Sequence, residues 1–508
     1  MKAAQAAGNP DADAFEKAWG SGQPSVFFRR RIADLETPVS AFLKLGPELP
    51  YSFLLESVQG GEARGRYSII AMAPDLVWRC KNGKAESAFH GKPFVPEAAA
   101  PLQSLRTLVA ACRFTLPQGL PPMVAGLFGY LGYDMVREME RLPDKNPDTL
   151  HVPDAVMVRP SIICVFDNVR DEMLIVTIAW PRADIPAAHA YAAAILRLDE
   201  AEARLDGPLP ATIVPNAVPV LADSVTSNTA YADYLDMVER AKAYIRAGDV
   251  FQVVPSQRFR LPFSLPPFSL YRSLRRLNPS PFLFFLNFPG YAVVGSSPEI
   301  LVRLRHDKVT IRPIAGTAPR GSTPEEDADL AARLIADPKE RAEHLMLLDL
   351  GRNDVGRVVK TGTVKVTEQF VVERYSHVMH IVSNVEGEIA PGKDAVDALI
   401  AGFPAGTLTG APKVRAMEII DELESERRGI YAGAVGYVGA DGSMDTCIVL
   451  RTAVIKDGTM YVQAGGGVVA DSDPQAEYTE TVNKSKALIR AAEDAIQFVS
   501  AVKRNRPQ

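Results

Sequence analysis

The chain has 508 residues, of which 47% are hydrophobic and 23% are charged, the ordinary balance of a globular protein. Its net charge of -5 and its isoelectric point of about 5.9 argue against a surface that binds nucleic acid or an anionic membrane. The four cysteines are widely spaced without a Cys-x-x-Cys pair, which argues against a structural zinc site or a disulfide framework. The N-terminus lacks a secretory signal pattern and no apolar run reaches membrane-spanning length, so we expect a cytoplasmic protein.

The first part of the chain predicts several strands and one long helix. Residues 1–24 are polar, and we expect a loose start there. The runs 67–70, 161–166 and 173–178 are rich in apolar and β-branched residues, which is typical of strands. Residues 186–205 have helical spacing with Pro186 in the first turn, and the helix is expected to stop at the Asp-Gly-Pro sequence that follows.

A change in composition divides the chain. Residues 207–227 are rich in proline and small residues and show neither a helical nor a strand period, so we expect a linker. We therefore predict an N-terminal region at 25–206 and a C-terminal region at 228–502, packed against each other. The second region opens with a predicted helix from Tyr231 to Ala247 that ends at Gly248.

Two strand-like runs end in small residues that carry hydrogen-bonding groups. Gly295 to Glu299 holds one carboxylate, which could act as a general acid if burial raises its pKa. Gly316 and Thr317 end a similar segment and offer an N–H group and a hydroxyl group to a substrate carboxylate. Each segment also fits an ordinary turn.

Asp337 and Pro338 predict the start of a helix, with aspartate as N-cap and proline in the first turn. Glu340 and Glu343 are three residues apart and therefore share one helix face. The apolar run at 345–348 makes the helix apolar almost all round, so we expect it to be buried. Glu340 alternatively completes a capping box with Asp337, an explanation that Glu343 lacks.

Three further features have competing interpretations. His377 and His380 lie three residues apart, but their apolar neighbours favour a packed strand or helix over a pair of metal ligands, which leaves one histidine for acid–base chemistry. The glycine-rich loop at 403–413 lacks the spacing of a phosphate loop, which argues against nucleotide binding. Arg451 ends an apolar run, so it either pairs with a protein or substrate carboxylate or lies in solvent.

The most informative segment runs from residue 463 to 474. Three consecutive glycines follow a strand-like run, and Asp473-Pro474 then opens a helix that carries Glu477, Glu480 and Lys484. Glycines let the backbone approach an anionic ligand and leave amide groups free to bind it. Two glutamate pairs on two helices suit Mg²⁺, which takes few protein carboxylates and keeps positions for water and substrate oxygens. We therefore predict a small polycarboxylate held by backbone amides, a lysine and Mg²⁺.

Long ordered motifs resemble the chorismate-utilising enzymes, most closely anthranilate synthase component I, over roughly residues 27–499. The motifs are FQVVPSQRF (251–259), NPSPFLFF (278–285), GSSPE (295–299), PIAGT (313–317), ERAEHLMLLDLGRND (340–354), FPAGTLTGAPKVRAMEII (403–420) and QAGGGVVADSDPQAEYTETVNKSKAL (463–488). The resemblance implies an α/β (α+β) fold, a large sandwich of packed antiparallel sheets covered by helices. It also implies a regulatory role for residues 25–206 and chorismate binding by residues 228–502.

The resemblance assigns roles to single residues. Metal ligands match Glu343 and Glu480, with Glu340 and Glu477 acting through water. Glu299 matches the acid that protonates the departing C4 hydroxyl of chorismate, and His380 matches the histidine linked to pyruvate elimination. The substrate-binding groups match Gly316, Thr317, Tyr431, Arg451, Gly465, Gly466, Gly467 and Lys484.

Two positions separate this chain from its relatives. Enzymes of the family that add water at C2 carry a lysine base where this chain has Gln252, which cannot deprotonate water but can hydrogen-bond ammonia. Enzymes that aminate C4 use a lysine nucleophile where this chain has Ala315. Both positions favour attack of ammonia at C2. The resemblance implies that the product, 2-amino-2-deoxyisochorismate, then loses pyruvate to give anthranilate, the first step of tryptophan biosynthesis.

The resemblance also implies a partner and a regulator. No cysteine lies in a Gly-x-Cys-x-Gly setting, so the ammonia is expected from a glutamine amidotransferase subunit in a hetero-oligomer. Segments LLES (54–57) and GRYS (65–68) resemble a tryptophan feedback site, in which Phe282-Leu283 replaces the more common Tyr-Met pair. Its expected residues are Glu56, Ser57, Arg66, Pro281, Phe282, Leu283, Tyr437 and Cys447.

Three alternatives stay open. One is an enzyme that stops at 2-amino-2-deoxyisochorismate and releases no pyruvate. The second is an aminodeoxychorismate synthase, which Ala315 disfavours. The third is a non-catalytic, tryptophan-sensing scaffold subunit, which the presence of both glutamate pairs, Arg451 and Lys484 disfavours.

Overall fold

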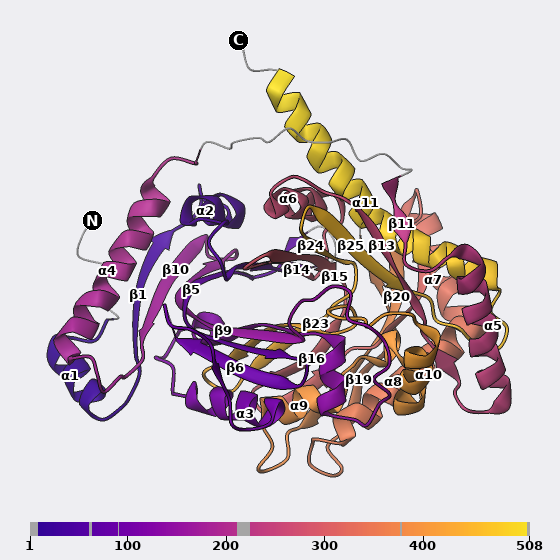
Figure 1. Cartoon of the computed structure of the whole chain (residues 1–508), viewed down its shortest axis with the longest axis horizontal. Helices are drawn as coiled ribbons and strands as arrows, with labels where there is room; N and C mark the ends of the chain where they lie inside the picture. The colour runs from indigo at the N-terminus through magenta and orange to yellow at the C-terminus, as the bar shows by residue number, and fades with distance from the viewer. Residues whose placement is uncertain (1–8, 60–62, 90, 211–223, 376–377, 505–508) are drawn as a thin grey trace.

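The computed structural model describes residues 9–59, 63–89, 91–210, 224–375 and 378–504, in which helices cover two packed layers of strands (Figure 1). The α-helices are α1 (Ala12–Gly20), α2 (Pro38–Leu45), α3 (Pro101–Ala111), α4 (Ala187–Asp206), α5 (Tyr231–Ala247), α6 (Pro267–Leu277), α7 (Pro324–Ala336), α8 (Pro338–Gly356), α9 (Ala395–Gly402), α10 (Lys413–Leu423) and α11 (Pro474–Arg504). Short 3-10 helices are η1 (Pro122–Val124), η2 (Tyr133–Glu138) and η4 (Gly406–Leu408).

The strands of the first region are β1 (Ser25–Ile32), β2 (Ser52–Glu56), β3 (Val58–Gln59), β4 (Ala63–Arg64), β5 (Tyr67–Lys81), β6 (Lys84–Phe89), β7 (Val95–Pro96), β8 (Gly126–Leu131), β9 (Ala155–Asp167) and β10 (Glu172–Ala179). The strands that follow are β11 (Thr226–Ser227), β12 (Gln252–Val253), β13 (Ser256–Pro262), β14 (Phe282–Phe288), β15 (Tyr291–Ser297), β16 (Ile300–Arg305), β17 (Lys308–Ile311), β18 (Ile314–Pro319), β19 (Lys365–Arg374), β20 (Val378–Glu388), β21 (Gly410–Ala411), β22 (Ala434–Gly439), β23 (Met444–Ile448), β24 (Thr452–Lys456) and β25 (Thr459–Gly465).

The two layers of the sandwich are antiparallel. One follows the order β1-β10-β9-β5-β2-β14-β15-β24-β25-β13-β11. The other follows β8-β22-β23-β16-β17-β20, and β20 also pairs with β18 and β19. The long strand β9 joins the layers, because its first half pairs with β8 and its second half pairs with β10. The predicted fold class is therefore confirmed.

Strand β14 shows how the sequence divides the core. Its side chains alternate between two faces, as the period of a strand requires. Phe284, Leu286 and Phe288 point into the core between the layers. Leu283 and Phe285 point the other way, into a second core under α2, α6 and α11, where Phe285 contacts aromatic rings of α2 and α6.

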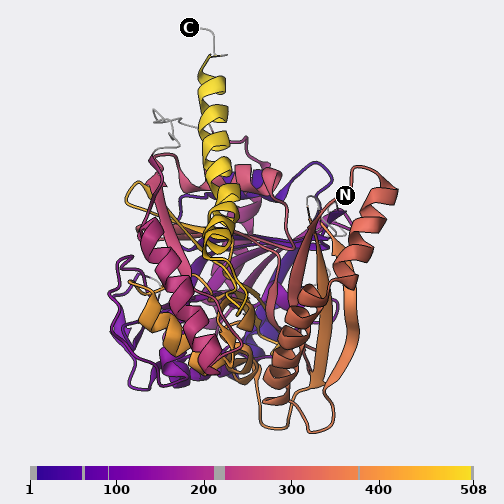
Figure 2. The ribbon, with the colours of Figure 1, turned by 90° about the vertical axis from the view of Figure 1, so that its right-hand side faces the viewer.

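The helices cover the outer faces of the layers. α1 and α4 lie over β1 and β10, while α6 and α11 lie over β15 and β25 (Figure 1). α7 and α8 pack on β18 and β20. The C-terminal end of α11 stands away from the rest of the chain (Figure 2). Within the described ranges, no helix is long and apolar enough to cross a membrane.

The predicted elements can now be compared with the structure. The strand runs lie in β5, β9 and β10, and the helix predicted at 231–247 has these bounds, ended by Gly248 in the left-handed conformation. The helix predicted at 186–205 is α4, with Pro186 as its N-cap residue. The loose start was wrong for residues 12–20, because Phe15 is buried and anchors α1. Most of the predicted linker, residues 211–223, lies outside the described residues.

The regions before and after this segment share sheets. β2 pairs with β14, and β8 pairs with β22, so strands of the first region lie inside the layers of the second. The core between the layers contains side chains from both regions. The two regions therefore pack against each other through continuous sheets, and their division at about residue 207 stays a prediction.

Candidate functional site

Helix α8 packs on β18 and carries the first glutamate pair, Glu340 and Glu343. The Asp337 side chain caps the helix by accepting hydrogen bonds from the N–H groups of Lys339 and Glu340, at 2.8 and 3.2 Å. Glu340 and Glu343 are both half-buried. A Cβ atom on Gly316 would lie 3.0 Å from Oε2 of Glu340, so the glutamate faces β18.

The expectation that α8 is buried all round was wrong. The side chain of Leu345 is 54% exposed, whereas Leu347 and Leu348 are buried. The helix therefore has one face against β18 and β20 and one face in solvent. The alternative capping-box role of Glu340 finds no support among the described hydrogen bonds, in which Asp337 caps the helix without a return bond from Glu340.

Helix α11 brings the second glutamate pair. Asp473 caps it by accepting from the N–H of Ala476 at 2.8 Å. Oε1 of Glu477 accepts a hydrogen bond from Ser472 at 2.7 Å, while Oε2 is buried without a hydrogen-bond partner in the described chain. Glu480 pairs with Lys484 at 2.7 Å, and Lys484 also donates to the Gly465 carbonyl at 2.9 Å.

The four glutamates influence one another. Burial raises the pKa of Glu340, Glu343 and Glu477, and the charge of Glu480 raises each of these pKa values further. Among the described residues, no group of three acidic, histidine or cysteine side chains is gathered as a metal cage. The donor set still fits a hard divalent cation, because the oxygens are carboxylate oxygens and Oε2 of Glu477 lacks a partner.

The backbone of the triple glycine lies against neighbouring groups, and a side chain at any of the three positions would force one of these groups to move. A Cβ atom on Gly465 would stand 2.9 Å from the Pro255 carbonyl and 3.1 Å from Oη of Tyr431. A Cβ atom on Gly466 would stand 2.7 Å from Oε2 of Glu477. One on Gly467 would stand 2.7 Å from the amide nitrogen of Gln252. The three glycines thus lie close to Tyr431, Glu477 and Gln252, while their approach to an anionic ligand stays a prediction.

Gln252 connects β12 to the glutamates. β12 pairs with β21, which places Gln252 opposite Ala411. The side-chain amide of Gln252 donates a 3.2 Å hydrogen bond to Oε1 of Glu343, and its side chain is almost fully buried. A neutral donor therefore stands where the resemblance implies a lysine base in the water-adding relatives.

Glu299 has the environment predicted for a general acid. It follows β15 and is 7% exposed. Burial raises its pKa to about 8, although the hydrogen bond from Thr407 at 3.1 Å and the charge of Arg451 both lower it. Glu299 is therefore mostly protonated at neutral pH and can donate a proton.

Arg451 lies beside Glu299 with a half-buried side chain and a positive φ of 49°. Burial lowers its pKa, yet in the part of the chain that the structure describes its guanidinium group makes no ion pair with a carboxylate. The predicted carboxylate partner is therefore not a described protein side chain. A guanidinium group without a carboxylate partner among the described residues is suited to binding an anionic ligand.

His380 on β20 faces the bulge of β18. Its Nδ1 atom lies 2.9 Å from the Gly316 carbonyl and 3.2 Å from Oγ1 of Thr317. A carbonyl can only accept, so Nδ1 carries the hydrogen and Nε2 keeps a lone pair. Burial lowers the pKa of His380 to about 4, which keeps the ring neutral. His377 lies outside the described residues.

The predicted turn at Gly316 was wrong in detail. Residues 314–319 form β18, and a bulge between Ala315 and Thr317 interrupts its pairing with β20. Gly316 has a φ of 67°, a left-handed conformation that glycine adopts without strain. The bulge turns the Gly316 carbonyl toward His380, which a plain strand would not do.

A cavity of about 860 Å³ lies between the two sheet layers. Seven of the eight residues expected for tryptophan binding line it, namely Glu56, Ser57, Arg66, Pro281, Phe282, Tyr437 and Cys447. Leu283 does not, because strand alternation turns it into the core under α6 and α11, where it is 1% exposed. The carboxylate of Glu56 is held by Tyr271 and by two hydrogen bonds from Arg275.

Several residues of this cavity were not predicted from the sequence. Arg303 and Arg305 alternate along β16 and share Asp445 as an ion-pair partner. Tyr375 also lines the cavity, and its ring lies 5.5 Å from that of His380. The period-2 spacing of the two arginines was the signal that could have found them.

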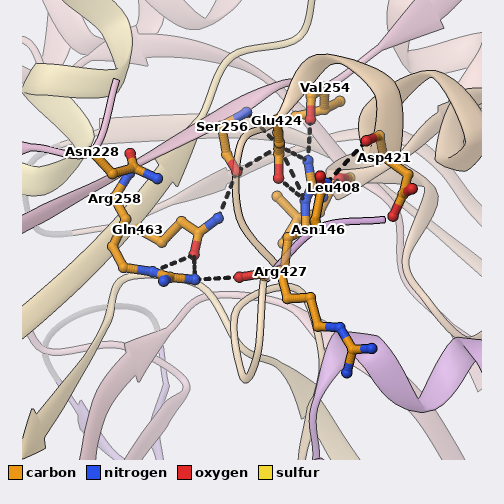
Figure 3. Close-up of polar contacts among 11 residues, drawn as sticks. Asn146, Asn228, Val254, Ser256, Arg258, Leu408, Asp421, Glu424, Arg427 and Gln463 are labelled. Carbon is orange, nitrogen blue, oxygen red and sulfur yellow. Dashed lines mark hydrogen bonds and ion pairs between the residues drawn. The ribbon is translucent and has the colours of Figure 1, made fainter. Parts of the chain in front are cut away.

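A buried polar network behind the glycines was also missed. Ser256 donates its N–H and its hydroxyl to Oε1 of Glu424, both at 2.8 Å, and accepts from Gln463 at 2.8 Å (Figure 3). Gln463 in turn accepts from Arg258 (Figure 3). Ser256 and Arg258 are alternate residues of β13, which pair with Gly465 and Gln463 of β25, so the network lies at the strand end that carries Gly465.

The chain is similar to known proteins over most of its length. The family model of the chorismate binding enzymes matches residues 52–490. Anthranilate synthase component 1 of Cereibacter sphaeroides is 59% identical over 490 residues, which cover 96% of this chain and 98% of that protein. The component 1 of Pseudomonas aeruginosa is 48% identical over 477 residues, covering 92% and 95%. The crystal structure of anthranilate synthase component I from Streptococcus pneumoniae superposes with a TM-score of 0.74 at 37% identity, covering 90% of this chain and 98% of that chain.

Proposed function

The chain belongs to the chorismate-binding enzymes, with anthranilate synthase component 1 as its relatives over nearly its whole length, and we propose that it converts chorismate and ammonia to anthranilate, pyruvate and water. The observation that carries the proposal is Glu299, a buried carboxylic acid with a pKa of about 8, beside the guanidinium group of Arg451, which forms no ion pair with a carboxylate of the described residues. This arrangement supplies a proton donor and a carboxylate-binding group at neighbouring positions.

The substrate-binding groups follow from the site. Arg451 and Lys484 supply positive charge for the substrate carboxylates, and Tyr431, Thr317 and the amides of Gly316, Gly465, Gly466 and Gly467 supply hydrogen-bond donors. Glu343 and Glu480 would hold Mg²⁺, with Glu340 and Glu477 binding it through water. Magnesium, when bound, would neutralise a substrate carboxylate and orient it.

The proposed reaction has two steps. Ammonia forms a bond with C2 of the ring, and the C4 hydroxyl leaves as water after it receives the proton of Glu299. Gln252 offers a neutral amide to the ammonia. In the second step the ring loses pyruvate and aromatises, and the lone pair of His380 on Nε2 is free to accept a proton.

A turnover assay tests the proposal. The purified chain would be incubated with chorismate, Mg²⁺ and an ammonium salt, while anthranilate fluorescence and pyruvate are measured. We expect both products in equal amounts, and Glu299→Gln should abolish them. An amino product without pyruvate would instead identify a 2-amino-2-deoxyisochorismate synthase, and a para-amino product would identify an aminodeoxychorismate synthase. A chain that binds tryptophan without any turnover would be a sensor or scaffold.

The same assay tests the regulator and the partner. The cavity lined by Glu56, Phe282 and Tyr437 supports tryptophan as a feedback inhibitor, so tryptophan should suppress anthranilate formation. Glutamine should replace ammonium only when a glutamine amidotransferase subunit is added. Activity in a cytoplasmic fraction would support the expected localisation.

A further inference from the structure

A buried ion pair lies behind the candidate site. Nε of Arg428 donates to both carboxylate oxygens of Glu424, at 3.2 and 3.0 Å, and Nη2 donates to Oε1 at 2.6 Å. Arg428 is 2% exposed and Glu424 is 6% exposed. Ser256 donates two further hydrogen bonds to the same carboxylate (Figure 3). Both carboxylate oxygens of Glu424 thus accept hydrogen bonds from Arg428, and Oε1 also accepts from Ser256.

The remaining donors of Arg428 bind two backbone carbonyls of the site. Nη1 donates to the carbonyl of Leu408 at 2.7 Å, and Nη2 donates to the carbonyl of Val254 at 2.6 Å. Leu408 follows Thr407, which donates to Glu299. Val254 lies two residues after Gln252. One guanidinium group therefore links η4, which carries Thr407, to the residue that follows β12, the strand of Gln252.

The same guanidinium group also lies near the ring of Tyr431, three residues further along the segment that carries Arg428. The central carbon of the Arg428 guanidinium lies 5.6 Å from the ring centroid of Tyr431 and 5.0 Å from that of Tyr133. The hydroxyl of Tyr431 faces Gly465 at the end of β25. Arg428 therefore links the segments that carry Thr407 and Gln252 to its own segment, which carries Tyr431.

A buried ion pair alone is weak evidence for a stabilising role, because desolvation of two charges often cancels their attraction. An apolar pair of the same volume would fill the space, but it could not bind the carbonyls of Leu408 and Val254. We propose that Arg428 and Glu424 form a positioning pair for the proposed reaction, which fixes Thr407 against Glu299 while holding Gln252 and Tyr431 in register. This inference rests on the proposed function.

The pair predicts a signature in the pH dependence. Besides Thr407, the polar groups that face Glu299 are Arg451, Tyr375 and Asp354, which lines the small cavity behind Glu299. The Thr407 hydrogen bond lowers the pKa of Glu299. If the Leu408 carbonyl is released, Thr407 should move away and the pKa of Glu299 should rise. The alkaline limb of kcat/KM should then shift to higher pH, because the protonated acid persists further.

The experiment compares Arg428→Lys and Glu424→Gln with wild type. Lysine keeps the charge but cannot bind Glu424 and both carbonyls as the guanidinium fork does. Arg159→Lys is the matched control, since Arg159 is also buried, pairs with Asp75 and lies over the ring of Trp180 away from the site. We would measure kcat and KM for chorismate across pH, together with melting temperature and circular dichroism.

We expect kcat of both test variants to fall by about tenfold or more and their alkaline limb to move upward, since misplaced catalytic groups lose this much or more. Arg159→Lys should change the melting temperature but leave kcat, KM and the pH dependence as in wild type. If Arg428→Lys does not fold, Glu424→Gln decides the question. Variants that melt lower but keep wild-type kcat, KM and pH limb would overturn the positioning role. A wild-type chain without turnover would overturn the proposed function itself.

Discussion

The hydroxyl group of Thr407 donates a 3.1 Å hydrogen bond to the carboxyl group of Glu299 across two separate chain segments. Thr407 belongs to η4, whereas Glu299 follows β15. Because the carboxyl group is 7% exposed, this contact and the charge of Arg451 offset part of the cost of ionising it. The balance leaves Glu299 protonated at neutral pH.

The pH dependence of kcat/KM should report this acid. Because the pKa of Glu299 is about 8, kcat/KM should be nearly constant near pH 7. It should fall as the pH rises through about 8, where the acid loses its proton. Thr407→Val removes a contact that lowers the pKa, so its alkaline limb should lie at higher pH. A limb that moves to lower pH in this variant would contradict the role of the contact.

Stability should depend on the same group. The pKa of Glu299 rises from an ordinary 4.5 to about 8 on folding, so its stabilising effect is complete below 4.5 and is lost as pH increases toward 8. The loss is about 1.4 kcal/mol per pH unit at most in that window. Glu299→Gln removes the titration, so its melting temperature relative to wild type should increase from pH 5 to pH 8. A constant difference would show that Glu299 does not titrate on unfolding.

Gly466→Ala should disturb one glutamate of the candidate metal site. The added methyl group would stand 2.7 Å from Oε2 of Glu477, and the flexible end of that side chain is the part that can move. We expect a folded protein that needs more Mg²⁺ for half-maximal activity and gains less thermal stability from Mg²⁺. Gly20→Ala is the control, because a Cβ atom there meets no atom within 4 Å.

Tyr234→Phe should separate a metal-linked role from a packing role. The Tyr234 hydroxyl and Oε2 of Glu477 are both buried without partners in the described ranges, and both lie within 4 Å of a Cβ position on Gly466. Without Mg²⁺, loss of an unsatisfied hydroxyl should leave the protein equally stable or up to about 1 kcal/mol more stable. With Mg²⁺, the variant should gain less than wild type if Tyr234 orients a cation-bound water.

Tyr271→Phe provides the comparison for this prediction. Its hydroxyl is also buried but donates to Glu56 at 2.6 Å, so its removal should destabilise the protein by about 1–3 kcal/mol. Chemical denaturation with and without Mg²⁺ measures both variants. Equal Mg²⁺ stabilisation of Tyr234→Phe and wild type would restrict Tyr234 to packing.

The sequence indicated the side chains that could carry chemistry at the site better than it indicated the residues that hold them in place. Glu299, the two glutamate pairs and the triple glycine could be singled out as candidates by residue type and spacing, which are local patterns. Arg428 and Glu424 have the i, i+4 spacing of an ordinary surface pair, and nothing local shows that both are buried. Their role depends on the carbonyls of Leu408 and Val254, which the chain brings together only by tertiary packing.

The same limit explains the errors in the elements. The leucines at 345–348 suggested a helix surrounded by protein, but the position of β18 and β20 on one side of α8 leaves Leu345 in solvent. The bulge at Gly316 depends on the pairing of β18 with β20, a contact between segments more than 60 residues apart. Strand alternation, in contrast, could have excluded Leu283 from the cavity once Phe282 was assigned to it.

The opposite orientations of Phe282 and Leu283 give the last prediction. Phe282 lines the cavity of about 860 Å³, whereas Leu283 is buried in the core under α6 and α11. If tryptophan binds in this cavity, Phe282→Ala should weaken inhibition about tenfold, because an aromatic contact contributes about 0.5–1.5 kcal/mol beyond its buried area. Leu283→Met conserves volume in the other core and should change the inhibition constant less than about twofold. Inhibition curves and calorimetric titration with tryptophan measure both variants. Strong weakening by Leu283→Met with little effect of Phe282→Ala would place the inhibitor outside this cavity.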